Sequence, residues 1–167
     1  MRVLGIDPGS RITGLGVVEL KGRELIGIQS QAVRLGSGEL SLRLGDIYQA
    51  VTNMILETKP DVVAVEQVFM ATNAKAALIL GHARGSAVCA AVNAGVPVVE
   101  YSAKQIKQAV VGTGGADKAQ VQHMVRILLR LTKTPQSDAA DALACAICHA
   151  HTAQLESKLQ QGQQRRA

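Results

Sequence analysis

The chain has 167 residues, 47% of them hydrophobic and 19% charged, which fits one ordinary globular domain with its own core. It contains no run of about 18 apolar residues, which excludes a spanning helix, and its opening stretch lacks the regions of a signal peptide, so we expect a cytoplasmic location. A net charge of +5 at pH 7 favours a polyanionic partner, with nucleic acid as the first candidate.

The first half of the chain predicts three strands and then a helix. Residues 2–7, "RVLGID", form an apolar run that ends at Pro-Gly and is typical of a buried strand. Residues 12–20 and 24–35 flank the short turn "KGR", which indicates a hairpin, so the first three strands should be antiparallel neighbours. Residues 39–58 carry apolar side chains at helical spacing, and "KPD" ends that helix.

The second half predicts strands that lie parallel to the first one. Residues 62–66, "VVAVE", follow a helical crossover and are apolar up to the final acid, so both faces of this strand should be covered. Residues 96–101, "VPVVEY", should form a further buried strand. Helices are expected over residues 73–94, 102–110, 117–131 and 136–152. The elements predict an α/β fold with a mixed five-stranded sheet flanked by helices in one domain, 1–152, and a disordered Gln-rich tail, 153–167.

Carboxylates stand at the ends of several predicted elements. Asp7 and Glu66 each end a buried strand, and the carboxyl ends of neighbouring parallel strands meet at one edge of a sheet. Asp138 and Asp141, in "SDAADALA", are three residues apart and therefore share one helix face. Taken alone, Asp7 can be explained as a turn-forming residue. Taken alone, Asp138 and Asp141 can be explained as acids near a helix N-terminus, which the helix macrodipole favours. Together the acids indicate a site for hard cations, Mg²⁺ or Mn²⁺, in which two ions can support phosphodiester cleavage.

Several long motifs resemble one protein family. The motifs are "LGIDPGSRITGLG", "AVEQVFMATNAKAAL", "LGHARG", "EYSAKQIKQAVVGTGGADKAQVQHMV" and "SDAADALACAICHAH". In order and without large gaps over about residues 1–152, they resemble the RuvC-type Holliday junction resolvases, which are crossover junction endodeoxyribonucleases. The resemblance implies a ribonuclease H-like fold and a homodimer that resolves four-way (Holliday) DNA junctions by paired symmetric nicks during homologous recombination and DNA repair. It also implies the RuvA–RuvB branch-migration complex as a partner, and residues 73–94 are a candidate for the dimer interface.

The same resemblance implies roles for the acids. The family's four catalytic and metal-binding acids fall on Asp7, Glu66, Asp138 and Asp141, each within its matching motif. The implied metal is Mg²⁺, with Mn²⁺ as a substitute, and we expect two ions in each active site. Whether Asp141 is a direct ligand or a carboxylate outside the ligand set stays open.

Five further residues are predicted to contact DNA. Phe69 follows the second buried strand, where an aromatic ring can stack on an unpaired base, although a lone Phe is more often a core anchor. Lys118 lies near a helix start, where the macrodipole disfavours a cation, so phosphate binding would explain it; a solvated charge is the alternative. In the family, basic residues at the positions of Lys107 and Lys118 assist DNA binding and catalysis. Lys104 and Arg84 are further candidates for phosphate contacts.

Two other functions fit parts of the sequence. Actin-like and sugar-kinase-like ATPases also begin with a strand, an Asp, a glycine turn and a hairpin, but they need two lobes and 167 residues supply one. A junction-binding module without catalysis could share the fold. Such a binder of polyanions, however, gains nothing from acids concentrated at its DNA face.

Overall fold

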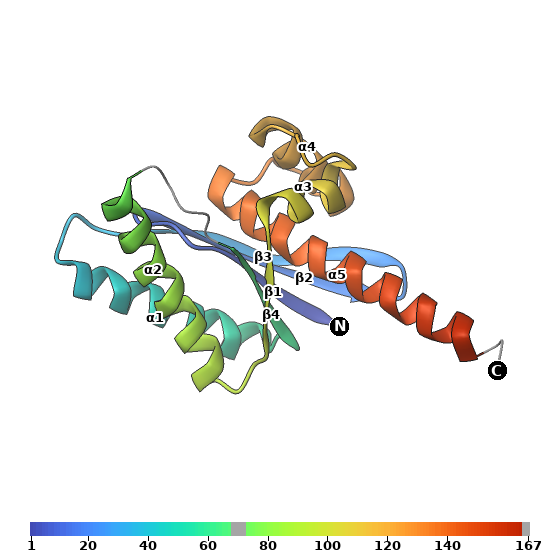
Figure 1. The fold of residues 1–167 in the computed structure, drawn as a ribbon, viewed down its shortest axis with the longest axis horizontal. Helices are drawn as coiled ribbons and strands as arrows, with labels where there is room; N and C mark the ends of the chain where they lie inside the picture. Colours follow the sequence, from blue (N-terminus) through green and yellow to red (C-terminus); the bar gives the residue numbers. More distant parts are fainter. Residues whose placement is uncertain (68–72, 165–167) are drawn as a thin grey trace.

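One β-sheet crosses the middle of the molecule, and helices cover both of its faces (Figure 1). The computed structural model of the chain describes residues 1–67 and 73–164. Its strands are β1 (Arg2–Asp7), β2 (Ile12–Lys21), β3 (Glu24–Arg34), β4 (Val62–Glu66) and β5 (Val98–Tyr101). Its helices are α1 (Leu40–Thr58), α2 (Ala74–Asn93), α3 (Ala103–Val111), α4 (Lys118–Leu128) and α5 (Ser137–Gln164).

The sheet has the mixed topology that the sequence predicts. The strand order is β3-β2-β1-β4-β5. β1 pairs antiparallel with β2, and β2 with β3, whereas β4 runs parallel to β1 and β5 parallel to β4. The predicted α/β class with a mixed five-stranded sheet is therefore confirmed. Because parallel strands end at the same edge of a sheet, the ends of β1 and β4 are the natural place for a site.

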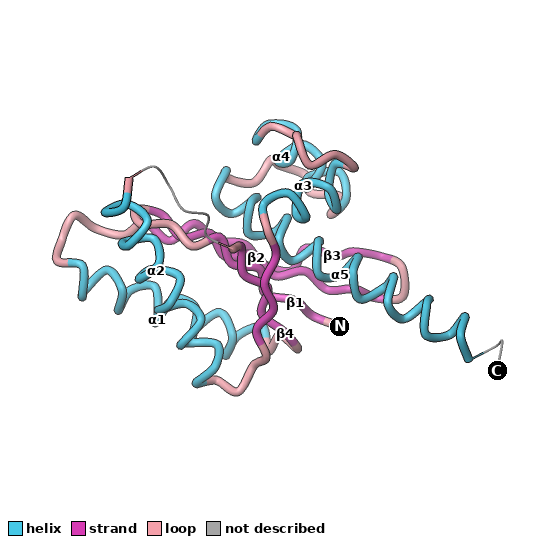
Figure 2. Tube along the Cα trace, viewed as in Figure 1, coloured by secondary structure: helices cyan, strands magenta, loops and turns pink. Residues whose placement is uncertain are grey.

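Two apolar cores, one on each face of the sheet, hold the three layers together (Figure 2). On one face, Ile47 of α1 and Ala87 of α2 belong to the same buried cluster as Leu4 and Ile6 of β1. On the other face, Val3 joins the core made with α3, α4 and α5. The central strands β1 and β4 are apolar on both sides because both sides are covered. Among the described residues, no helix combines the length and the apolar character needed to cross a bilayer.

The helix α5 lies unusually close to the sheet. A Cβ on Gly5 would overlap a carbonyl oxygen of α5, and one on Gly14 would overlap the carbonyl oxygen of Asp138. A Cβ on Gly16 would lie 2.8 Å from a backbone nitrogen of the same helix. Gly5 and Gly16 are cross-strand partners, and Gly14 pairs with Asp7. Three positions without a side chain therefore let the backbone of α5 settle directly on β1 and β2.

The short helices α3 and α4 begin at reciprocal capping boxes. Ser102 and Gln105 exchange side-chain and backbone hydrogen bonds at the start of α3, and Asp117 and Gln120 do the same at the start of α4. The second box makes Lys118 the first residue of α4. The negative charge of the Asp117 cap compensates for a cation at that end of the helix.

The end of α4 is closed by a residue in the left-handed conformation. Arg130 has a φ of 51°. The amides of Arg130 and Leu131 donate to the carbonyls of Ile127 and Arg126, which is the bond pattern of a Schellman motif. Glycine is the usual residue at this position, and a side chain in this conformation costs about 1 kcal/mol. The turn ends α4 earlier than the sequence predicts, since the predicted helix continues to residue 131.

The C-terminal segment differs from the expectation for it. α5 continues to Gln164, whereas the Gln-rich composition predicted disorder from residue 153. Gln, Lys, Glu, Leu and Ala are good helix formers, and no proline interrupts them, so the helix has no local reason to stop. Leu155 and Leu159 are each 59% exposed. This part of α5 therefore projects past the sheet rather than adding to a core (Figure 1).

Gly14→Ala should lower the free energy of unfolding by about 3 kcal/mol, near the upper end for a forced overpacking, because the new methyl group meets backbone that cannot rotate away. Denaturant titration followed by circular dichroism measures this difference.

Gly45→Ala is the matched control for this prediction. Gly45 is exposed on α1, and a Cβ there would meet nothing within 4 Å. Replacement of a glycine inside a helix by alanine stabilises the fold by about 0.5–1 kcal/mol, so this variant should be at least as stable as the unchanged chain. A Gly14→Ala variant of unchanged stability would contradict the close approach of α5 to the sheet.

Candidate active site

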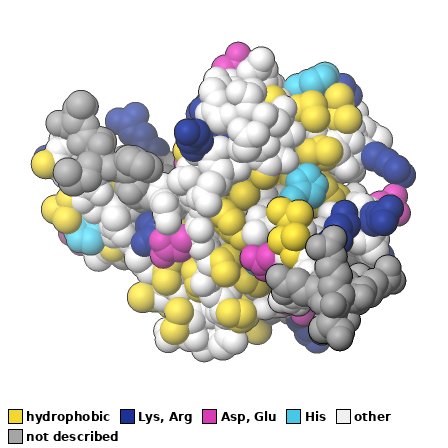
Figure 3. Space-filling model, turned by 45° about the vertical axis from the view of Figure 1, so that its right-hand side comes forward, with side chains coloured by type: hydrophobic (Ala, Val, Ile, Leu, Met, Phe, Trp, Pro, Cys, Tyr) yellow, Lys and Arg dark blue, Asp and Glu magenta, His cyan; other side chains and the backbone are white. Residues whose placement is uncertain are grey.

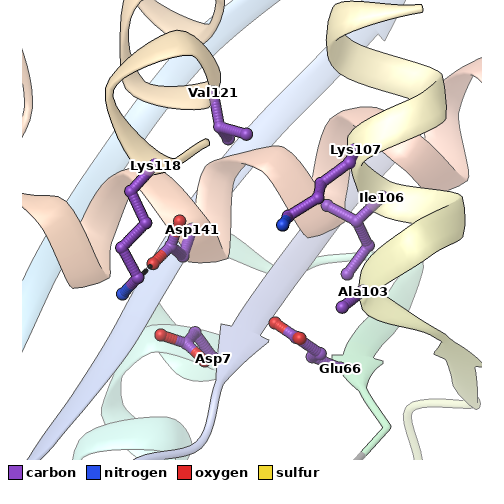
Figure 4. Close-up of a pocket in the computed structure, with 8 residues that line it drawn as sticks. All are labelled: Asp7, Glu66, Ala103, Ile106, Lys107, Lys118, Val121 and Asp141. Carbon is purple, nitrogen blue, oxygen red and sulfur yellow. Dashed lines mark hydrogen bonds and ion pairs between the residues drawn. The ribbon is translucent and has the colours of Figure 1, made fainter. Parts of the chain in front are cut away.

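Two carboxylates stand at neighbouring strand ends. Asp7 is the last residue of β1 and Glu66 is the last residue of β4. The two strands are parallel neighbours, with Ile6 opposite Val65 one position earlier. Their adjacency was inferred from the crossover pattern, and the register confirms it. Both acids therefore end at the same edge of the sheet, on the side that faces α5 (Figure 4).

The first turns of α5 bring a third carboxylate to this edge. The carbonyl of Asp138 packs on Gly14, which is the cross-strand partner of Asp7. Asp141 lies nearly one turn further along the helix, and its side chain points toward the space above Asp7 (Figure 4). The glycine contact that seats α5 on the sheet thus also places Asp141 near the strand ends.

These three acids line one pocket of about 260 Å³ together with two lysines. Figure 4 shows Asp7, Glu66 and Asp141 directed into a common space from β1, β4 and α5. Lys107 enters the same space from α3, and Lys118 enters it from α4. The full lining consists of Asp7, Glu66, Ala103, Ile106, Lys107, Lys118, Val121 and Asp141.

The carboxyl group of Asp7 is strongly perturbed. Burial raises its pKa from 3.8 to about 8, and the negative charges of Glu66, Asp141 and Asp138 act in the same direction. The positive charge of Lys118 opposes this rise but does not cancel it. Near neutral pH, Asp7 therefore holds its proton unless a further cation enters the pocket.

Glu66 shares this environment. Burial raises its pKa, and the negative charge of Asp141 adds to the effect. Lys118 and Lys107 act in the opposite direction. When all three carboxylates are ionised, the pocket carries more negative charge than its two lysines compensate, and this excess favours binding of a further cation.

Lys118 already supplies one positive charge to the pocket. Its Nζ lies 3.1 Å from Oδ2 of Asp141, and this ion pair raises the pKa of the lysine. The Lys118 side chain is 75% exposed, whereas that of Asp141 is 19% exposed. The lysine therefore reaches in from solvent on a long flexible stem, so a competing cation can take its place beside Asp141, or a phosphate can take the place of Asp141 beside the lysine.

Asp138 lies beside the pocket and is not part of its lining. Gln136 donates from Nε2 to Oδ2 of Asp138 at 2.5 Å, and its Oε1 accepts from the amide of Ala139. Gln136 thus ties the Asp138 side chain to the first turn of α5. The charge of Asp138 raises the pKa of Asp7, so Asp138 also contributes to the electrostatics of the pocket.

The donor set of the pocket fits a hard divalent cation. Carboxylate oxygens are the ligands that Mg²⁺ and Mn²⁺ prefer, and a doubly charged ion would relieve the repulsion around Asp7. Within residues 1–67 and 73–164, no three His, Cys, Asp or Glu side chains come close enough together to hold an ion as they stand. Asp141 is paired with Lys118 instead. The carboxylates of the pocket are therefore ligands of the right chemical type for a divalent metal, and one of them, Asp141, is paired with Lys118 in this structure.

The remaining predicted DNA contacts lie outside the pocket lining. Lys104 is exposed on α3, where a Cβ on Gly114 would lie 2.7 Å from its Cγ. Arg84 belongs to α2, which packs on the opposite face of the sheet, and it forms an ion pair with Glu100 of β5. Phe69 lies outside the described residues. Of the basic residues singled out from the sequence, the structure brings only Lys107 and Lys118 into the pocket.

Sequence reasoning missed the apolar wall of the pocket and the residue that holds Asp138. Ala103, Ile106 and Lys107 follow i, i+3, i+4 spacing, so this spacing was a signal that could have identified their common helix face. Val121 follows Lys118 by three residues, so these two side chains also share one helix face. Gln136 carried no such signal, because its role depends on the local path of the chain into α5.

The chain matches a family model over residues 3–149, and that model is described as crossover junction endodeoxyribonuclease RuvC. The crossover junction endodeoxyribonuclease RuvC of Vibrio parahaemolyticus serotype O3:K6 is 62% identical over 150 residues, which are 90% of this chain and 87% of the relative. The RuvC protein of Tolumonas auensis is 58% identical over 152 residues, which are 91% of this chain and 88% of the relative.

Solved structures show the same relationship. The structure of Thermus thermophilus RuvC in complex with Holliday junction substrate matches with a TM-score of 0.88 and 39% identity, covering 93% of this chain and 96% of that one. A second structure of T. thermophilus RuvC matches with a TM-score of 0.85 and 38% identity, covering 93% and 97%. These matches confirm the expected ribonuclease H-like architecture. With its matching motifs, its fold and its acid pocket, the chain belongs to the RuvC family of crossover junction endodeoxyribonucleases.

Proposed function

We propose that the chain is an endonuclease that resolves Holliday junctions by paired symmetric nicks during homologous recombination and DNA repair. One observation carries the proposal: carboxylates from β1, β4 and α5 line the same pocket as two lysines. A relative that is 62% identical is named a crossover junction endodeoxyribonuclease, and a closely similar structure was solved with a Holliday junction substrate. The reaction is the hydrolysis of a phosphodiester bond in DNA.

The catalytic and metal-binding acids of the proposal are Asp7, Glu66, Asp138 and Asp141. Membership in the family implies dependence on a divalent metal. We propose Mg²⁺, with Mn²⁺ as a substitute, and two ions in each site. Such ions lower the pKa of water and neutralise the charge of the phosphate. Asp7 and Glu66 suit this role because adjacent parallel strands hold them in place, whereas Asp141 must leave Lys118 before it can act as a direct ligand.

Lys107 and Lys118 are proposed to hold the scissile phosphate. A pocket of acids alone would repel DNA, and the two ammonium groups supply the attraction that draws a phosphate toward them. Positive charge fixed beside the reacting phosphorus also stabilises the negative charge that grows on its oxygens in the transition state. Lys118 is exposed and carried on the first turn of α4, so its ammonium group can exchange Asp141 for a phosphate oxygen.

Three further DNA contacts stay part of the proposal. Phe69 is proposed to stack on an unpaired base at the junction centre, and the support for this is its place beyond the strand that ends at Glu66. Lys104 shares α3 with Lys107 and is exposed, which suits a contact with a neighbouring phosphate. Arg84 is the weakest of the three, because its guanidinium already has an ion-pair partner in Glu100.

A homodimer is proposed because two symmetric nicks need two sites related by a two-fold axis. The Ala-rich helix α2 is the proposed interface, and its Leu78 and Val92 are 61% and 60% exposed. The nuclease domain is proposed to comprise residues 1–152. The RuvA–RuvB branch-migration complex is the proposed partner protein, and chromosomal DNA as the substrate supports a cytoplasmic location.

Asp7→Asn should lower junction nicking at least about 100-fold and leave junction binding largely intact, because the amide keeps the shape of the side chain but cannot supply a carboxylate charge. The assay incubates the purified protein with a mobile four-way junction or a linear duplex of the same sequence, with Mg²⁺ or with EDTA. Paired nicks should appear in the junction only, and only with metal.

Asp46→Asn is the matched control for the nicking assay. Asp46 is exposed on α1, on the face of the sheet that lies away from α5, so this variant should nick normally. Loss of junction binding by a folded Asp7→Asn protein would contradict the metal-site role. A junction that is bound but left uncut in both Mg²⁺ and Mn²⁺ would instead favour a non-catalytic binding module.

The free energy of unfolding of the metal-free protein should fall as the pH rises from about 4 to about 8. The pKa of Asp7 is 3.8 in the unfolded chain and about 8 in the folded chain, so over this range only the folded chain keeps the proton. Because the folded chain then binds more protons than the unfolded chain, the free energy of unfolding declines throughout this range and levels off above about pH 8. The decline should be smaller in Asp7→Asn, which carries no such proton, and chemical unfolding in EDTA at a series of pH values measures it.

The stabilisation of the fold by added Mg²⁺ should increase with pH, in contrast to the stability of the metal-free protein, which should fall. A metal needs the ionised carboxylate, so the rise in melting temperature caused by Mg²⁺ should grow as the pH approaches about 8. Asp46→Asn should follow the unchanged chain in both measurements. A metal-free stability that shows the same pH profile in the unchanged chain and in Asp7→Asn would show that Asp7 is not buried in an uncompensated acidic pocket.

A further inference from the structure

A second pocket, which is cationic, lies at the far end of α4 from the acid pocket. It has a volume of about 530 Å³ and is lined by Lys21, Arg23, Glu24, Leu25, Leu128, Arg130 and His151. We propose that this pocket, here called the hairpin pocket, binds a backbone phosphate of a junction arm some distance from the scissile phosphate. The inference rests on the proposed function, because it assigns a second contact to the same DNA substrate.

The charge of the hairpin pocket suits a phosphate. Lys21, Arg23 and Arg130 contribute three positive charges, against one negative charge from Glu24. In Figure 3, Lys and Arg side chains gather toward the right-hand edge of the face, beside an acidic side chain. Arginine and lysine around an open hollow are the groups that most often contact DNA phosphates.

The two cations that form ion pairs in the hairpin pocket are exposed, which lets a phosphate compete for them. Arg130 Nη1 lies 2.9 Å from Glu24 Oε1, with the two side chains 81% and 53% exposed. Lys21 Nζ lies 3.5 Å from Glu19 Oε2. Exposed pairs of this kind contribute little to stability, so a phosphate can compete for the cations. Within the described part of the chain, Arg23 takes part in none of the recorded ion pairs.

The backbone of Arg130 supplies an observation that is independent of charge. Arg130 occupies the left-handed position of the Schellman turn after α4, with a φ of 51°. Glycine would relieve that strain, and among the described residues the Arg130 side chain makes only the exposed ion pair with Glu24 in return. Strain that is kept without a structural gain points to a function for the side chain.

The spacing between the two pockets suits a DNA backbone. Lys118 at the start of α4 lines the acid pocket, and Arg130 just after its end lines the hairpin pocket. Lys118 and Leu128, the first and last residues of α4, lie about 15 Å apart along the helix axis at 1.5 Å per residue, and Arg130 lies just beyond that end. Phosphates of one strand advance about 3.4 Å each along the duplex axis, so about five phosphates span this distance. Both pockets lie on the side of the sheet that α5 covers, so one DNA arm can reach them together.

Arg130→Gly tests the proposal because it should weaken junction binding without lowering the stability of the fold. Loss of one phosphate contact should reduce the slope of log K against log salt by about 0.9, which weakens junction binding about fivefold at about 0.15 M salt. Glycine at a left-handed position should leave the melting temperature unchanged or raise it. Fluorescence anisotropy with a labelled junction in EDTA, over a series of salt concentrations, measures the slope.

Two further variants distinguish the loss of a phosphate contact at this site from a general loss of positive charge. Lys59→Gly removes one positive charge from the other non-glycine residue of the described chain with positive φ, 47°, which lies at the end of α1. This variant should keep the salt slope of the unchanged chain. Arg130→Lys keeps the charge and the strained backbone, so it should retain most of the affinity.

Equal salt slopes for Arg130→Gly and Lys59→Gly would overturn the proposal. A fall in the melting temperature of Arg130→Gly would also overturn it, since the side chain would then have a structural role. The unchanged chain is assayed in parallel for nicking of the junction with Mg²⁺. If it does not nick, the proposed function fails; if it nicks and the Arg130→Gly slope is normal, only the hairpin pocket fails.

Discussion

The contact between the backbone of α5 and three glycines of the sheet controls where the acids of the site lie. Gly5, Gly14 and Gly16 present bare backbone to the helix, and a Cβ at any of them would meet helix backbone. Because Gly14 is the cross-strand partner of Asp7, the helix is seated within one residue pair of the first acid. Catalytic groups must be held within about 0.5 Å of their productive positions, so the helix cannot be lifted by a methyl group without loss of the site.

The close packing of α5 on the sheet brings like charges together. Their repulsion destabilises the folded chain, and the packing of the rest of the fold compensates for it. Asp7 and Glu66 are held at the ends of adjacent parallel strands, and both line the same pocket as Asp141. Burial and mutual repulsion raise the pKa of both strand-end acids. A chain with a net charge of +5 thus concentrates negative charge at one edge of its sheet. Perturbed acids of this kind are typical of sites that bind cations or transfer protons.

The strand-end acids could be predicted from the sequence because they follow from a topological rule. The crossover α1 joins β3 to β4, and β3 runs parallel to β1 because two antiparallel pairings separate them, so β4 is expected parallel to β1. Asp7 and Glu66 then share an edge once those two strands are neighbours. Asp138 and Asp141 followed from helical spacing. The ion pair between Lys118 and Asp141 could not be predicted, because it depends on how α4 sits against α5.

Two helix ends and one further ion pair could not be predicted from the sequence. The Schellman turn at Arg130 was missed because an arginine gives no signal for a left-handed backbone, whereas a glycine would have done so. The helical continuation of α5 to Gln164 was missed because composition alone cannot distinguish a solvated helix from a disordered chain when both are rich in Gln and Lys. The ion pair of Arg84 with Glu100 joins elements whose side-chain contacts no sequence pattern reports.

The dependence of the site on α5 also has a consequence during biosynthesis. A ribosome delivers β1 and β4 well before α5, so a nascent chain contains Asp7 and Glu66 for some time without the acids of the last helix. The sheet can begin to form in that interval, but it holds only half of the carboxylate set. The proposed four-acid site is therefore complete only once the final helix has docked on the glycines of the sheet.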